Sequence, residues 1–144
     1  MTRLLRNLTV ASFLLLAGCA RSNDPVHVED AWANATPEGS TVGAVYMTLT
    51  TKEADTLLSA TATVADHIEM HTSSEHNGMM QMRPMENAPL EAGKPFTFAP
   101  GGAHFMLMGL RQPLTAGLSF PMTLRFQHAP EQTVQVQVVE LGSR

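Results

Sequence analysis

Apolar and polar residues alternate along most of the chain, in short runs that Gly, Pro and Asn interrupt. The clearest run is residues 133–139, where valines occupy every second position from Val134 and glutamines lie between them. Residues 120–126 show the same period of two, with Phe, Met, Leu and Phe on one face. Such alternation is typical of half-buried β-strands, and helical periodicity is largely absent.

The same pattern predicts about nine short strands in all. Turn signals separate them, such as Pro37-Glu38-Gly39, Asn77-Gly78 and Pro100-Gly101-Gly102. Many short strands joined by such turns indicate an all-β fold, either a Greek-key sandwich or a barrel. Besides the two runs above, we expect strands near residues 26–32, 42–50, 56–64, 67–72, 79–83, 96–99 and 104–110.

The first residues depart from this pattern. Arg3 and Arg6 precede an apolar stretch from residue 8 to residue 17, and residues 16–19 are Leu-Ala-Gly-Cys. This is the layout of a secretory signal, and its end resembles the bacterial lipobox, where cleavage before the Cys leaves a thiol that carries lipid. The apolar stretch is too short to span a bilayer. We expect a signal peptide at 1–18, a tether at 19–25 lipidated on Cys19, and a β-domain at 26–144. The alternative is a plain signal peptide with an incidental Cys.

Charge and composition exclude several classes of function. The chain of 144 residues has a formal net charge of -4 at pH 7, and loss of Arg3 and Arg6 with the signal would move it to -6. An acidic domain is a poor nucleic-acid binder. The sequence has no Ser-His-Asp ordering, Gly-rich phosphate loop or convincing carboxylate pair. We therefore expect no nucleic-acid partner and no enzymatic activity.

Residues 67–85 are predicted to form a β-hairpin with its turn inside residues 75–78. If the loop is Asn77-Gly78 alone, Met82 lies diagonal to His71 across the two strands. If all four residues form the loop, Met82 faces His71 directly. Either register puts the two side chains on the same face of the hairpin.

A second pair of metal-binding side chains lies further along the chain. His104 and Met106 are two positions apart in a predicted strand, so they project to the same face. Together with His71 and Met82 they make two imidazoles and two thioethers, all neutral. The soft sulfurs favour copper(I) over hard cations and over zinc. A blue-copper centre is excluded because it needs a thiolate, and the only Cys is Cys19, outside the expected domain.

The spacing of these four residues resembles the signature of the periplasmic copper chaperones called PCu(A)C. That signature is a His, ten residues, a Met, twenty-one residues, then His-x-Met, and His71, Met82, His104 and Met106 match it. Neighbouring stretches such as residues 41–46 and 106–110 also look like the family. The resemblance implies a cupredoxin-like β-barrel that binds copper(I) at an exposed site. It further implies delivery of copper toward the copper A centre of cytochrome c oxidase, alongside Sco-like proteins.

On this basis we expect a monomeric metallochaperone, lipid-anchored at the periplasmic face of a bacterial membrane. Its expected partners are proteins that donate or accept copper, namely the oxidase subunit with copper A or a Sco-like protein. Two alternatives stay open from the residues alone. The protein can be a periplasmic copper buffer or resistance protein that stores the metal, or a β-sandwich lipoprotein that binds protein partners and no metal.

The remaining Met and His residues have less specific roles. Met is a flexible core filler, so we expect Met47, Met108 and Met122 to pack inside the domain. His67 shares the face of His71 under simple alternation and is either a supporting group or solvated, and His76 is expected to be exposed at the turn. Four further methionines either pack or form a soft outer shell that hands copper on, namely Met70, Met79, Met80 and Met85.

Overall fold

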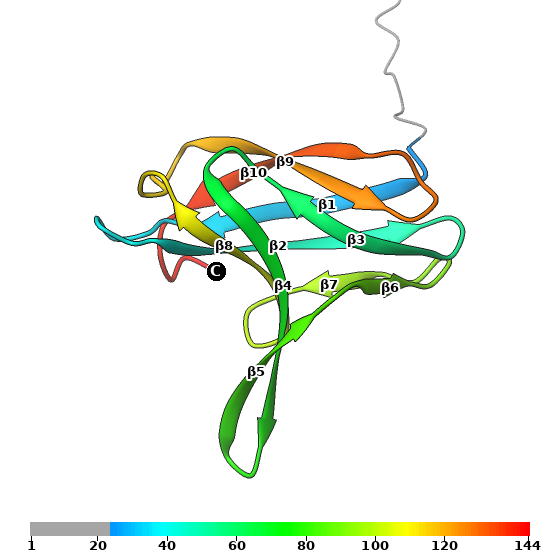
Figure 1. Ribbon diagram of the computed structural model, residues 1–144, viewed down its shortest axis with the longest axis horizontal. Coiled ribbons are helices and arrows are strands. Elements are labelled where there is room, and N and C mark those ends of the chain that lie inside the picture. Colours follow the sequence, from blue (N-terminus) through cyan, green and yellow to red (C-terminus); the bar gives the residue numbers. More distant parts are fainter. Residues whose placement is uncertain (1–23) are drawn as a thin grey trace, which may run out of the picture.

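The computed structural model describes residues 24–144, which form ten β-strands and no helix. The expected signal peptide and Cys19 lie outside these residues. No helix of the described part is long and apolar enough to cross a membrane. The strands are β1 (Val26–Asn34), β2 (Val42–Thr51), β3 (Asp55–Thr61), β4 (Ala65–His76), β5 (Met79–Met85), β6 (Ala88–Leu90), β7 (Phe96–Phe98), β8 (Ala103–Leu110), β9 (Ser119–Phe126) and β10 (Gln132–Val139) (Figure 1).

All ten strands belong to one sheet that curls around a single core (Figure 1). Their order is β5-β4-β8-β7-β2-β1-β10-β9-β3-β6, and β8 pairs with β2 as well. The sheet is not closed by pairing between its edge strands β5 and β6. The predicted all-β class is confirmed. The one strand that was not predicted is β6, because its three residues include Pro89. Proline interrupts a strand signal and is tolerated in β6 because this strand lies at the edge of the sheet.

The core is built from the inward positions of alternating strands. Phe105 and Leu107 of β8 are fully buried, and the ring of Phe98 stacks on Phe105 with centroids 4.1 Å apart. Met47 and Met122 are buried there as predicted. The prediction for Met108 is wrong: its pairing with His67 places it on the outward face of β8, where it is only half-buried.

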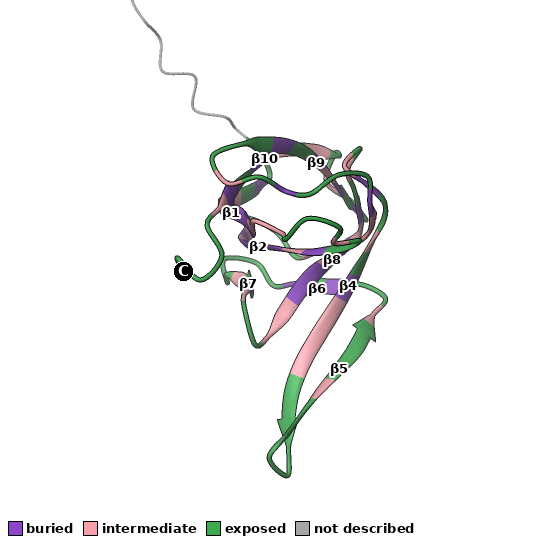
Figure 2. Cartoon of the chain, turned by 90° about the vertical axis from the view of Figure 1, so that its left-hand side faces the viewer, coloured by how far each residue is buried: buried purple, intermediate pink, exposed green. Residues whose placement is uncertain are grey.

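The β4–β5 hairpin extends beyond the body of the sheet (Figures 1 and 2). β4 pairs with β8 as far as Thr72, and its last residues pair with β5. His76 pairs with Met79, so the loop is Asn77-Gly78. Both loop residues have positive φ, 51° and 76°, which suits the tight turns that match the twist of a two-residue hairpin. The structure therefore selects the two-residue loop of the two predicted registers.

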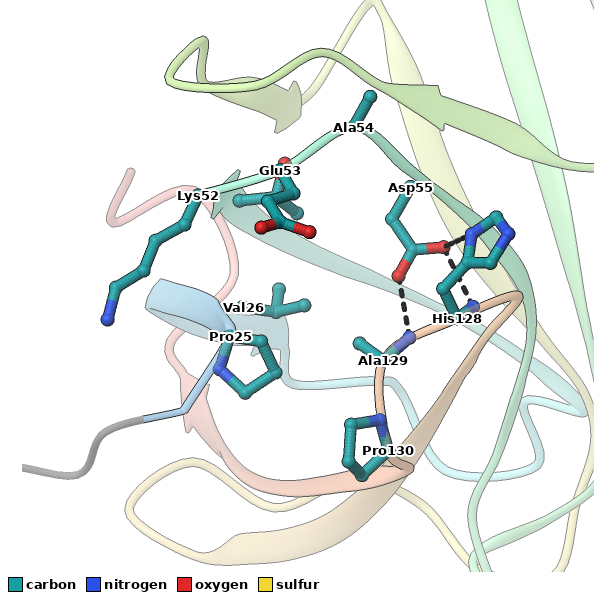
Figure 3. A pocket seen from close by; sticks show the side chains of 10 residues that line it. Pro25, Val26, Lys52, Glu53, Ala54, Asp55, His128, Ala129 and Pro130 are labelled. Carbon is teal, nitrogen blue, oxygen red and sulfur yellow. Dashed lines mark hydrogen bonds and ion pairs between the residues drawn. The ribbon is translucent and has the colours of Figure 1, made fainter.

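A buried carboxylate joins the start of β3 to the turn between β9 and β10 (Figure 3). Asp55 accepts hydrogen bonds from the backbone N–H groups of Thr56, His128 and Ala129 at 2.7, 3.0 and 2.8 Å. The Nδ1 of His128 lies 3.2 Å from the same carboxylate. Asp55, His128 and Ala129 border a cavity of about 380 Å³ beside Pro25. Burial raises the pKa of Asp55, but the hydrogen bonds lower it by more, so this pKa lies below its ordinary value of 3.8.

We expect Asp55→Asn to lower the free energy of unfolding at pH 7 by about 1–3 kcal/mol, because an amide cannot accept from all of these donors. A carboxyl whose pKa is depressed on folding stabilises the native state above its unfolded pKa. That stabilisation is lost as pH falls through the lower, folded pKa. The difference between wild type and variant in urea unfolding should therefore shrink from pH 7 to pH 3. A difference that stays constant over this range would contradict the assignment.

Candidate metal site

The pairing of β4 with β8 brings two imidazoles together. His71 and His104 are directly opposite each other in this antiparallel pair. Their ring centroids are 6.0 Å apart and the ring planes meet at 71°. An ion about 2 Å from a ring nitrogen lies about 3 Å from that ring's centroid, so two rings that share one ion have centroids about 5–6 Å apart. The observed separation fits one shared ion with little movement.

The two thioethers lie on the same face as the imidazoles. Met106 is opposite Glu69 on β4, and Met82 of β5 is opposite Ser73, diagonal to His71. Because antiparallel partners point to the same side of a sheet, all four candidate residues project outward from three neighbouring strands, β5, β4 and β8. The predicted parity of the two pairs is confirmed, and the pairs meet where the hairpin leaves the sheet.

Exposure rises across the site from β8 to β5. His104 is 6% exposed and the side chain of His71 is 16% exposed. Met106 is half-buried, whereas Met82 is 55% exposed. β4 accordingly passes from buried and half-buried residues near the sheet to exposed residues at the tip of the hairpin (Figure 2). The two imidazoles are thus largely shielded from solvent, and the site opens to solvent on the Met82 side.

Hydrogen bonds define which nitrogen of each imidazole carries the proton. The Nδ1 of His104 lies 3.0 Å from the carbonyl oxygen of Gly102, and the Nε2 of His71 lies 2.9 Å from a carboxylate oxygen of Glu69. Both partners accept, so both of these nitrogens must donate. This leaves a lone pair on Nε2 of His104 and on Nδ1 of His71. The latter atom is buried and has no hydrogen-bond partner among the described residues.

Glu69 also contacts a second imidazole on the same face. The Nε2 of His67 lies 3.2 Å from its other carboxylate oxygen. Hydrogen bonds from His71 and then from His67 lower the pKa of Glu69, so this carboxylate stays ionised and accepts from both. A carboxylate that holds the N–H of a ligating imidazole is a common support of metal sites. Glu69 was not predicted as a supporting residue, although strand alternation between His67 and His71 places it on their face.

The residues of this site are suited to a soft metal ion. The described part of the chain contains no cluster of three or more His, Cys, Asp or Glu side chains that can hold a metal. The further donor atoms on the face of the two imidazoles are the thioether sulfurs of Met82 and Met106. Thioethers bind copper(I) well and bind hard ions such as magnesium and calcium poorly. The buried, unpartnered Nδ1 of His71 is the donor atom that such an ion would satisfy.

The other methionines of the hairpin lie on its two faces. Met70 is 6% exposed and belongs to the core, and its partner Met85 packs against that core. Met79 is exposed on that same reverse face, near the tip. Met80, also exposed, lies on the face of Met82. Of the four methionines left open by the sequence, Met70 and Met85 are packing residues.

Comparison with known proteins gives the relatives of this chain. Residues 26–138 match the family described as "Putative lipoprotein LpqE-like". A relative from Leifsonia xyli subsp. xyli, "Putative lipoprotein Lxx21020", is 35% identical and covers 98% of this chain and 93% of its own length.

Solved structures with the same architecture include several PCuAC domains. The copper-bound PCuAC domain from PmoF2 aligns with a TM-score of 0.69 at 24% identity, over 81% of this chain and 93% of that one. The solution structure of apo-DR1885 from Deinococcus radiodurans aligns with a TM-score of 0.64 at 28% identity, over 100% and 97%. Its copper(I) form aligns with a TM-score of 0.62 at 29% identity, over 85% of each chain.

These matches cover the β-domain almost from end to end. The cupredoxin-like fold and the resemblance to the PCuAC family, both expected from the spacing of four residues, are confirmed. The family match alone spans well over half of the chain. The chain therefore belongs to the LpqE-like family, and its domain has the fold of the PCuAC proteins.

Proposed function

We propose that this domain is a copper(I) chaperone that binds one ion through His71, Met82, His104 and Met106. One observation carries the proposal: two imidazoles with their N–H groups bonded elsewhere share a face with two thioethers. The similar PmoF2 domain was solved with copper bound, and DR1885 was solved with copper(I). Both support copper as the ligand here.

Copper(I) is the oxidation state that this set of donors favours. Four neutral donors bring no negative charge to offset a divalent ion, and thioether sulfur prefers the softer monovalent state. The exposed ligand Met82 also allows exchange, since a donor from another protein can reach the ion beside it. His104, buried and held by Gly102, is the least accessible of the four ligands.

Because solvent exposure of the ligands rises from β8 to β5, copper would enter and leave the site on the β5 side. An accepting protein approaches from the side of β5 and meets the exposed thioether of Met82 before it meets the imidazoles. Each of the four donors on this chain is neutral, so its release from copper(I) leaves no separated charge on this protein. We infer that the domain acts at the periplasmic face of a bacterial membrane, held by lipid on Cys19. The proposed recipients are a copper A subunit of cytochrome c oxidase or a Sco-like protein.

Storage is the second candidate function. A periplasmic buffer or resistance protein would use the same four ligands, and the exposed Met82 serves uptake as well as delivery. The two functions differ in what happens when a copper-accepting partner is present.

The ligand set is tested by substitution. We expect Met82→Leu or Met106→Leu to weaken copper(I) binding at least tenfold, about 1.4 kcal/mol, because leucine keeps the volume and removes the sulfur donor. The double variant Met82→Ala, His104→Ala should lose the one-to-one complex. Titration against a competing chelator such as bicinchoninate measures both. Met79→Leu, on the reverse face of the same hairpin, is the control, and unchanged stoichiometry in the double variant would overturn the assignment.

Glu69 is tested as the group that orients His71. Removing such a supporting carboxylate typically lowers metal affinity about 10–100-fold, so we expect Glu69→Ala to weaken copper(I) binding by this amount. Glu75→Ala is the matched control, because Glu75 lies on the same face of β4 but opposite Met80. Equal losses in the two variants would show that only the negative charge of this face matters.

Delivery is tested against storage by mixing copper-loaded protein with an apo copper A domain or an apo Sco-like domain. A chaperone should transfer most of its copper to one of them within minutes, as followed by the absorbance of the reconstituted acceptor and by separation of the two proteins. Retention of the metal in the presence of both acceptors would favour the storage protein.

A further inference from the structure

The far end of the β4–β5 hairpin exposes a group of methionines. Met79, Met80 and Met82 are 64%, 61% and 55% exposed, and they make up half of the large exposed apolar side chains in residues 24–144. The hairpin projects away from the body, and its tip contacts no other strand (Figures 1 and 2). Packing therefore does not explain these side chains, and exposed apolar groups gathered in one place indicate a function.

The two faces of the hairpin differ in chemistry. Met80 lies opposite Glu75 and Met82 lies opposite Ser73, so both methionines share the face of His71. Met79 lies on the reverse face. Arg83 is also there and donates to Gln81 at 3.1 Å. Because Arg83 is the only Lys or Arg between residues 65 and 85, no such cation lies on the face of Met80.

Met80 is close enough to Met82 for the two sulfurs to share one ion. Residues two apart in a strand are about 6.6 Å apart, and each Met side chain has three rotatable bonds that can shorten the gap between sulfurs. Glu75, directly across from Met80, has its Cβ about 5 Å from that of Met80. Its carboxylate attracts a monovalent cation to this part of the face.

We propose that Met80 is a transfer ligand, which binds copper(I) together with Met82 while the ion passes between the main site and the tip of the hairpin. This inference rests on the proposed function. Copper remains bound to Met82 while its bonds to His71, His104 and Met106 break and a bond to the Met80 sulfur forms. The ion stays in the monovalent state, each imidazole regains its lone pair, and no proton or electron is exchanged.

The position between the sulfurs of Met80 and Met82 binds copper transiently during transfer and is not a second storage site. It offers two donors against four, so copper spends most of its time at the imidazoles. A ligand of this kind changes the rate of transfer much more than the equilibrium affinity. This property distinguishes Met80 from Met82, whose removal changes both.

The chain provides a matched pair of variants for the test. Met80→Leu removes the sulfur on the face of Met82, and Met79→Leu removes a sulfur of nearly equal exposure on the reverse face. Leucine preserves size and apolar character in both. Copper(I)-loaded wild type and variants are mixed with bicinchoninate in a stopped-flow instrument, and the absorbance of the chelator complex gives the rate of release. Affinities are measured in the same buffer at equilibrium.

We expect Met80→Leu to release copper about fivefold more slowly than wild type, with an affinity within about twofold. Met79→Leu should match wild type in both measurements. Equal rates for Met80→Leu and wild type, or equal slowing in the two variants, would overturn the role of Met80. A wild-type protein that takes up no copper(I) would instead overturn the proposed function itself, so the two failures are distinguishable.

Discussion

The candidate site depends on one constraint, the register between β4 and β8. This register places His71 opposite His104 and Glu69 opposite Met106. A shift by one residue would turn every side chain of one strand to the other face and separate the imidazoles. The register is held from the reverse side, where Met70 and Phe105 are opposite each other and buried in the core. Packing of the interior thereby determines the arrangement of donor atoms on the exterior.

The hydrogen bonds of the imidazoles add a second level of order. Gly102 fixes the ring of His104 through a backbone carbonyl, and Glu69 fixes the ring of His71 through a carboxylate. Each ring is therefore set in one tautomer before a metal arrives, which lowers the ordering cost of binding. The thioethers lack such restraints, and Met82 is mostly exposed. A pair of imidazoles restrained by hydrogen bonds, beside an exposed thioether, is a suitable arrangement for an ion that has to be held and then released.

Much of this arrangement was predictable from local sequence. Period-two alternation predicted nine of the ten strands, and Asn77-Gly78 fits the observed two-residue hairpin loop. The parity of His71 with Met82, and of His104 with Met106, followed from the same alternation. The direct pairing of His71 with His104 was not predictable, because it joins strands more than thirty residues apart whose contact depends on the whole sheet. The outward position of Met108 and the contacts of Glu69 with His67 and His71 were predictable, because both follow from alternation within a single strand. The ligand roles themselves stay proposals.

The central claim is that one copper(I) ion is held by two imidazoles and two thioethers at the junction of hairpin and sheet. X-ray absorption at the copper edge of the loaded protein tests it most directly, because nitrogen and sulfur scatter differently. The expected result is copper(I) with two nitrogen and two sulfur neighbours, and one fewer sulfur neighbour in Met106→Leu. A shell of nitrogen and oxygen alone, or a shell unchanged by that substitution, would contradict it.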